Sequence, residues 1–277
     1  MNDITVTFSY DPKKLVAVLG CGPAGLLAAW AVEQAGGIPV IISRRVRSSL
    51  PGAQYLHEEI PELYIDSADI RTERIGTRQG YALKVYGDEN APVSWDLQQP
   101  VRRAWNLRSM YDVLWTYYED RIINANLGLV ELRTLVAAFP LVISTLPANA
   151  FCVNPLEHRF DWSAVDVIMY SSAPLNTVVY DGQPESSITR TARVFGYGTT
   201  EFTRRDLRGA RYEEGPRVPG VEVYRPIKAI KVIGTNCDCH SEVVRIGRFG
   251  KWSKNYLSHM AYGDALSAYQ QLQEKVA

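Results

Sequence analysis

The sequence has few cysteines, no surplus of charge of either sign and no long apolar run. Four cysteines in 277 residues are too few for the disulfide framework of a small secreted protein. Lys and Arg total 30 and Asp and Glu total 30, so a general polyanion-binding surface is not expected, although local basic patches remain possible. No window approaches the roughly 20 apolar residues that span a bilayer. The polar start Met1–Thr5 also lacks the apolar region of a signal peptide.

What the sequence does contain is enough apolar material for a core. Hydrophobic residues make up 46% of the chain and charged residues 22%, as in an ordinary globular protein. At roughly 100–200 residues per domain, the length allows one large domain or two interleaved ones. We therefore expect an α/β protein of the cytoplasm, with no membrane partner and with nucleic acid disfavoured as a partner but not excluded.

Residues 15–42 have the pattern of a dinucleotide-binding motif. The apolar runs Leu15–Leu19 and Ile38–Ile42 predict two strands, and the residues between them predict a glycine loop followed by a helix. Glycines at these spacings allow a tight turn, a close approach to a pyrophosphate and close packing of helix and strand. The N–H groups at the start of the helix then bind phosphate. The nucleotide site is predicted at Gly20, Gly22, Pro23, Ala24 and Gly25.

The acidic residue that commonly follows the second strand and binds ribose hydroxyls is missing. The strand ends in Ser43-Arg44-Arg45 instead. Two interpretations stay open. Either Arg44 or Arg45 meets the 2′-phosphate of NADP, or Ser43 holds the ribose of FAD and the arginines lie near the adenine or the pyrophosphate.

With Pro23 and Ala24 at its centre, the glycine loop resembles the FAD loop of glutathione-reductase-type flavoproteins. Three further segments are similar to elements of the amine-oxidase and UDP-galactopyranose-mutase branches: the loop Arg47–His57, the strand and turn Leu141–Pro147, and Val243–Trp252 with the helix that follows. The resemblance implies a Rossmann-type FAD-binding domain with FAD as cofactor. It also implies that the last helix directs its N-terminus at the flavin ring, where reduced flavin is negative.

The resemblance implies roles for particular residues. Those placed beside FAD are Ser43, Arg44, Gln54, Gly247, Phe249 and Leu257. The segment Thr189–Phe195 resembles a mutase strand whose first arginine reaches the substrate diphosphate, which implies substrate binding by Arg190, with Arg193 and Trp252 beside it. Because the chain is much shorter than a typical mutase, the flavin scaffold is carried over and the mutase reaction is not.

Residues 164–234 contain short runs rich in β-branched and aromatic residues, which predict strands in series. Strands without long helices between them indicate an antiparallel sheet, the usual substrate platform of the superfamily that the chain resembles. The parallel strands come from both ends of the chain, so the two domains interleave. We expect an FAD-binding domain of residues 1–60, 128–150 and 241–277, and a substrate domain of residues 61–127 and 151–240.

Flavin enzymes leave most of the chemistry to the cofactor, so the protein mainly orients the substrate. The candidate catalytic residues are therefore the polar side chains of the segments expected to face the flavin, namely Tyr55, His57, Lys251 and His259. A histidine can act as a base near neutral pH. The competing interpretation of either histidine is a structural or surface hydrogen bond.

Cys237-Asp238-Cys239-His240 brings two thiols and an imidazole into four residues. Zinc sites favour a C-x2-C spacing and need a second pair of ligands, and Cys21 and Cys152 do not supply one. We therefore expect no metal site and interpret the segment as a chance cluster in a turn, with a metal site or a vicinal redox pair as alternatives.

These observations favour an FAD-dependent enzyme that oxidises or rearranges a small polar substrate. The basic residues Arg102, Arg103, Arg108 and Arg190 suggest a carboxylate or phosphate on an amino-acid-like or nucleotide-linked substrate. Three alternatives remain open: an NADP-dependent reductase, a flavin-dependent C–N lyase that acts on a modified nucleobase, and a nucleotide-binding sensor without catalysis.

Overall fold

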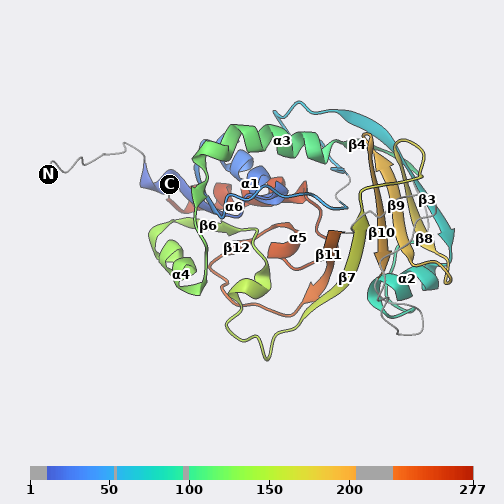
Figure 1. Cartoon of the computed structure of the whole chain (residues 1–277). Helices are drawn as coiled ribbons and strands as arrows, with labels where there is room; N and C mark the ends of the chain where they lie inside the picture. The colour runs from blue at the N-terminus through green and yellow to red at the C-terminus, as the bar shows by residue number, and fades with distance from the viewer. Residues whose placement is uncertain (1–10, 53–54, 96–99, 204–226, 277) are drawn as a thin grey trace.

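The computed structural model describes residues 11–52, 55–95, 100–203 and 227–276, which form two sheets, with most of the helices around the parallel sheet and α2 (Arg78–Tyr86) against the mixed sheet (Figure 1). The parallel sheet consists, in spatial order, of β12 (Val244–Arg245), β6 (Leu141–Ser144), β1 (Leu15–Leu19), β2 (Ile38–Ser43) and β5 (Ile123–Asn124). The mixed sheet consists, in order, of β11 (Ile227–Thr235), β7 (Phe160–Ile168), β10 (Tyr197–Thr203), β9 (Ile188–Val194), β8 (Thr177–Gly182), β3 (Ser67–Gly76) and β4 (Val101–Trp105).

The helices are α1 (Pro23–Gln34), α2 (Arg78–Tyr86), α3 (Leu107–Tyr118), α4 (Leu129–Ala138), α5 (Gly247–Gly250) and α6 (Met260–Val276), with short 3-10 turns η1 (Pro12–Lys14), η2 (Glu119–Arg121) and η3 (Ala148–Phe151). None of the helices in the described ranges combines the length and the apolar character that a membrane crossing requires.

The core forms on both faces of the parallel sheet because β1 is apolar throughout. Val16 and Val18 contact the core shared by α1, α3 and α6, whereas Ala17 and Leu19 contact the core under α4. Successive side chains of a strand point to opposite faces, so this one strand joins the two helical layers. The expected α/β fold is confirmed.

The helix α3 covers α1 through its apolar stripe. Its buried residues are Leu107, Met110, Tyr111, Leu114, Trp115 and Tyr118, a spacing of three and four that keeps them on one helical face. Asn106 caps the helix by accepting from the N–H groups of Arg108 and Ser109, each at 3.1 Å. The aromatic side chains of α3 therefore serve packing.

One expectation about the second sheet needs correction. The sheet is not purely antiparallel, because β3 pairs in parallel with β8. The segment from α3 to β5 packs with the parallel sheet, since α3 contacts α1 and β5 extends that sheet through the pairing of Ser43 with Asn124.

The two sheets are interleaved along the chain. Within the described residues, the chain crosses between them four times, after β2, β4, β6 and β11. The last two crossings are the connection from β6 to β7 and the return from β11 to β12. Part of the region 164–234 that predicts strands, residues 204–226, lies outside the described residues.

Candidate functional site

The glycine loop connects β1 to α1 with open space in front of the helix. Gly20 has φ +105°, a conformation that favours glycine, and a side chain on Gly25 would collide with the Gly20 carbonyl oxygen. Glycine at these two positions therefore allows β1 and α1 to pack closely. By contrast, a Cβ on Gly22 would meet nothing within 4 Å. Gly22 is the N-cap of α1 and Pro23 its first residue, so the open space lies beside the unpaired N–H groups of the first turn.

The end of β2 lies beside this loop. The Cys21 thiol is buried and donates to Ser43 Oγ at 3.2 Å, which connects the loop to the second strand. Arg45 forms an ion pair with Asp120 at 2.9 Å, whereas Arg44 is exposed. One of the two arginines expected to meet a 2′-phosphate is therefore already engaged with a carboxylate.

The C-terminal segment lies against the glycine loop. A Cβ on Gly247 would come within 2.8 Å of the Ala24 Cβ, and one on Gly250 within 2.6 Å of the Ser144 carbonyl oxygen. The short helix α5 therefore packs on the first βα unit. Phe249 is partly exposed and Leu257 is half-buried in the same segment.

A row of polar side chains crosses one face of the mixed sheet. Tyr180, Arg190 and Glu201 are directly opposed on β8, β9 and β10. The Arg190 guanidinium donates to the Glu201 carboxylate and, at 3.0 Å, to the Gly52 carbonyl oxygen. Lys231 of β11 completes the row with an ion pair to Glu201 at 2.5 Å. Burial alone would raise the pKa of Glu201, but Arg190 and Lys231 outweigh it and lower that pKa to about 2.

Lys254 adds a further cation next to this row. Its backbone N–H donates to the Ile233 carbonyl of β11 at 3.3 Å, and its Nζ donates to the Tyr86 hydroxyl at 2.5 Å. Burial lowers the pKa of Lys254 to about 7, and the neighbouring charges of Lys231, Arg248 and Arg190 act in the same direction.

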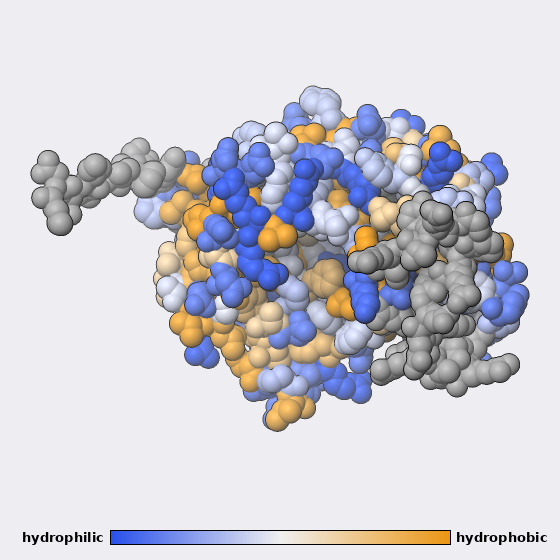
Figure 2. Space-filling view, in the orientation of Figure 1, coloured by the Kyte–Doolittle hydropathy of each residue, from blue (hydrophilic) through white to orange (hydrophobic). Residues whose placement is uncertain are grey.

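The region holds more positive than negative charge. Four cationic side chains, Arg190, Lys231, Arg248 and Lys254, influence one another's ionisation, and Glu201 is the carboxylate among them in the described part of the chain. Figure 2 shows a hollow near the centre of the face in view, bordered by both hydrophilic and hydrophobic residues, close to where Figure 1 draws α5. Such a site fits an anionic group such as a carboxylate or a phosphate.

Two predicted histidines come together beside the cationic cluster. The rings of Tyr55 and His57 stack with centroids 4.8 Å apart, and His57 stacks on His259 at 5.6 Å. Arg102 contacts His57 Nδ1. Burial lowers the pKa of His57 to about 4, with Arg102, His259 and Arg248 contributing. Burial also lowers the pKa of His259, despite the carboxylate of Glu58 at 3.6 Å from its Nε2.

These pKa shifts change the expected role of His57. A guanidinium can only donate, so Arg102 fixes Nδ1 as the acceptor, and the proton of the neutral ring lies on Nε2. With its pKa near 4, His57 is neutral at pH 7 and presents a hydrogen-bond donor rather than a base.

Four sequence-predicted residues lie apart from this cluster or outside the described chain. Trp252, expected to bind substrate, is buried in a core cluster, and its indole N–H donates to the Asp161 carbonyl at 3.0 Å. Arg193 is three residues from Arg190 on the same strand and so lies on the opposite face. Lys251 pairs with Asp264 at 2.7 Å on α6. Gln54 lies outside the described residues.

Three residues of this cluster, Glu201, Lys231 and Lys254, are not predicted from the sequence. A weak signal was present in β10, where Glu201 is a charged residue in an otherwise uncharged strand that is buried over most of its length. A carboxylate in such a strand needs a cationic partner, which can come from any neighbouring strand. No pattern in the sequence indicates Lys254, because the residues that it contacts belong to β11 and α2.

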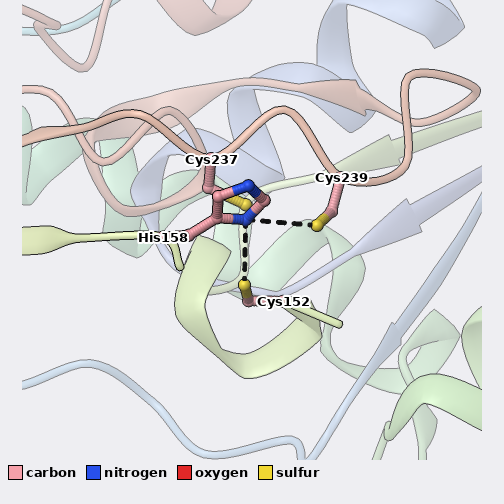
Figure 3. A group of neighbouring side chains, drawn as sticks. All are labelled: Cys152, His158, Cys237 and Cys239. Carbon is pink, nitrogen blue, oxygen red and sulfur yellow. Dashed lines mark hydrogen bonds between the residues drawn. The ribbon is translucent and has the colours of Figure 1, made fainter. Parts of the chain in front are cut away.

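A second group of side chains gathers at the last two crossings between the sheets (Figure 3). Cys152, His158, Cys237 and Cys239 each place one donor atom within 4.8 Å of the others. Cys152, together with His158, thus lies beside Cys237 and Cys239, a proximity that the cysteine spacing in the sequence does not indicate. His240 does not join the group and instead contacts the Glu242 carboxylate at 3.1 Å.

No protein-family model matches this sequence, and no curated protein sequence does. Solved structures do resemble it in three dimensions. Reduced UDP-galactopyranose mutase superposes with a TM-score of 0.57 at 9% identity, over 95% of this chain and 96% of that chain. A geranylgeranyl bacteriochlorophyll reductase-like protein from Thermoplasma acidophilum gives 0.55 at 11%, over 95% and 78% of the two chains. The flavin-dependent halogenase BrvH from Brevundimonas sp. BAL3 gives 0.52 at 13%, over 96% and 73%. The chain therefore has a Rossmann-type α/β fold with an interleaved second sheet.

Proposed function

We propose that the protein is an FAD-dependent enzyme that acts on a small anionic substrate. The observation that carries the proposal is the contact between Gly247 and Ala24, which joins the nucleotide-binding loop to the C-terminal segment. The next residue, Arg248, belongs to the cationic cluster on the mixed sheet. A ligand that extends from the glycine loop past α5 therefore reaches the cationic cluster, which suits an anion.

The chain's residues fit FAD at the glycine loop. The open space at Gly22 suits a pyrophosphate beside the N-terminus of α1, since a side chain there would occupy it. Ser43 is the residue for the ribose, and the exposed Arg44 suits the adenine or the pyrophosphate. When bound, FAD supplies hydride or electron transfer.

The residues of the cluster then have distinct roles toward the substrate. Arg248 and Arg102 bind its carboxylate or phosphate, and Arg190, held by Glu201, adds positive charge behind them. His57 donates a hydrogen bond from Nε2. Lys254 exchanges a proton near neutral pH, because its lowered pKa leaves both of its forms populated there.

The reaction class follows from this assignment only in part. Flavin-mediated oxidation or rearrangement of an amino-acid-like or nucleotide-linked substrate fits an anion site beside a flavin, as expected for an enzyme of the amine-oxidase or mutase-like branch. The superpositions on UDP-galactopyranose mutase and on the halogenase BrvH support the superfamily as a whole. An NADP-dependent reductase has less support, because Arg45 is paired with Asp120.

The absorption spectrum of the purified protein tests the proposal. We expect the two visible bands of an oxidised flavin, and FAD in the supernatant after heat denaturation. A protein that is colourless as purified and stays colourless after incubation with FAD and removal of free ligand would overturn it. Binding of NADPH by that colourless protein would favour the reductase instead.

A further inference from the structure

Three thiols and one imidazole converge where the chain makes its last two crossings between the sheets (Figure 3). Cys152 directly follows η3, and His158 lies two residues before the start of β7. Cys237 and Cys239 lie in the return connection between β11 and β12. The four donor atoms come from segments about 80 residues apart in the sequence, so the fold, and not local spacing, assembles them.

The distances are those of a tetrahedral metal site. The Sγ atoms of Cys152 and Cys239 lie 3.4 and 3.5 Å from the same atom, His158 Nδ1. Bond lengths of about 2.3 Å from zinc to sulfur and about 2.0–2.1 Å to nitrogen place tetrahedral sulfur and nitrogen ligands roughly 3.5 Å apart. The 4.8 Å limit on all four donor atoms also accommodates the slightly longer sulfur–sulfur edges of such a tetrahedron.

Hydrogen bonding explains the group poorly. One imidazole nitrogen either donates one proton or accepts at one lone pair, so it can satisfy one thiol well and not two. The third sulfur, that of Cys237, lies within the same 4.8 Å and also contacts the Arg245 guanidinium. The four cysteines are free, so no disulfide accounts for the convergence.

We propose that Cys152, His158, Cys237 and Cys239 bind a zinc ion as a closed Cys3His site. Four protein ligands leave no open position, which is the arrangement of structural rather than catalytic zinc. Soft thiolates with one imidazole select zinc over magnesium or calcium. The ion connects the exit from β6 to the return into β12 and so fixes the mixed sheet against the parallel sheet.

The surroundings fit a charged metal–thiolate centre. Three thiolates and Zn²⁺ leave about one negative charge. Arg245 faces this charge, with Nη1 at 3.2 Å from the Cys237 carbonyl oxygen and 3.8 Å from its sulfur. If His158 binds through Nδ1, its Nε2 carries the proton, and the Asp238 carboxylate lies 3.6 Å from that nitrogen. A carboxylate behind a zinc-bound histidine is a common way to orient the ring.

Metal analysis of the full-length protein tests the proposal. Cells are grown with added zinc, the protein is purified without chelators, and its metal content is measured by mass spectrometry. We expect about one zinc per chain, released when a mercurial reagent modifies the thiols. Cys239→Ser and His158→Ala should lose the zinc. Cys21→Ser and His240→Ala, which change a cysteine and a histidine outside the group, should keep it.

Cobalt(II) provides a second measurement if the ligand variants fail to fold. Added to the reduced, metal-free wild-type protein, it should give the intense long-wavelength bands of tetrahedral thiolate coordination, which lie beyond flavin absorption. The proposal is overturned if the wild type holds no zinc and gives no such spectrum. Retention of zinc in Cys239→Ser or His158→Ala, or a disulfide among the three cysteines in metal-free protein as isolated, would overturn it as well.

Discussion

The Arg190 guanidinium donates to the Glu201 carboxylate across directly opposed positions of β9 and β10. Glu201 also pairs with Lys231, so one buried carboxylate holds two cations on the face of the mixed sheet. A buried charge without its partner is costly, because the lost solvation is no longer offset. Glu201 is therefore the residue on which the geometry of the cationic site depends.

Replacing Glu201 by Gln should lower the free energy of unfolding by about 3–5 kcal/mol, because Arg190 and Lys231 would remain buried without their counter-charge. Urea denaturation measures the difference. Glu59→Gln, at an exposed position, is the matched control and should change stability little. Equal stability of the Glu201 variant and the wild type would show that the row is solvated.

The neutral state of His57 predicts a pH dependence of stability. Its pKa is lowered in the folded protein to about 4 from an ordinary value of 6.5. Between these values the unfolded chain binds a proton that the folded chain does not, so the contribution of His57 is complete above pH 6.5 and is lost as the pH falls toward 4. His57→Gln should show a shallower loss of stability over this window. Identical slopes for both proteins would contradict the neutral assignment.

Lys254 should impose a pH limb near 7 on turnover once a substrate is found, because its lowered pKa is about 7. Lys254→Met should remove this limb and retain flavin. Independently of substrate, acetic anhydride labelling followed by mass spectrometry should give a half-maximal pH near 7 for Lys254. A half-maximal pH near the ordinary lysine value of about 10.4 would rule out the assigned role.

Arg248 is exposed within the cationic cluster, and its Nε donates to the Tyr256 carbonyl at 3.2 Å. Arg248→Gln should raise KM for an anionic substrate by about tenfold or more, the loss expected for one hydrogen bond to a charged group, with flavin content unchanged. Arg193→Gln is the matched control, because Arg193 lies on the opposite face of the sheet. A rise in KM of the same size in both variants would place the substrate elsewhere.

The local part of the site could be predicted from the sequence, and the non-local part could not. The glycine loop between Leu19 and Pro23 is encoded by contiguous residues, and its strand, turn and helix formed as expected. The pairing of Arg190 with Glu201 depends instead on the register of two strands. Lys231 lies on β11, which β7 separates from β10 in the mixed sheet. No periodicity in the sequence specifies that register.

The cysteine group shows the same limit. Cys237 and Cys239 stand out locally, but the distance from Cys239 to Cys152 is set by how β6, β7, β11 and β12 are ordered in space. Similarly, Trp252 is expected from the sequence to bind substrate, yet it packs with Phe160 and Val232 in the core. Contacts between segments that are distant in the sequence therefore determine both the cysteine group and the burial of Trp252.

The most direct test of the central claim compares FAD binding by the wild type and by Gly22→Val, followed by quenching of flavin fluorescence. Gly22 has φ −73° and ψ 178°, which valine adopts readily, and its Cβ direction is open, so the variant should fold normally. The added side chain would occupy the space assigned to the pyrophosphate, so FAD binding should be lost. Gly263→Val, at an exposed glycine with equally open surroundings on α6, should bind FAD like the wild type. Normal FAD affinity in a folded Gly22→Val protein would contradict the account.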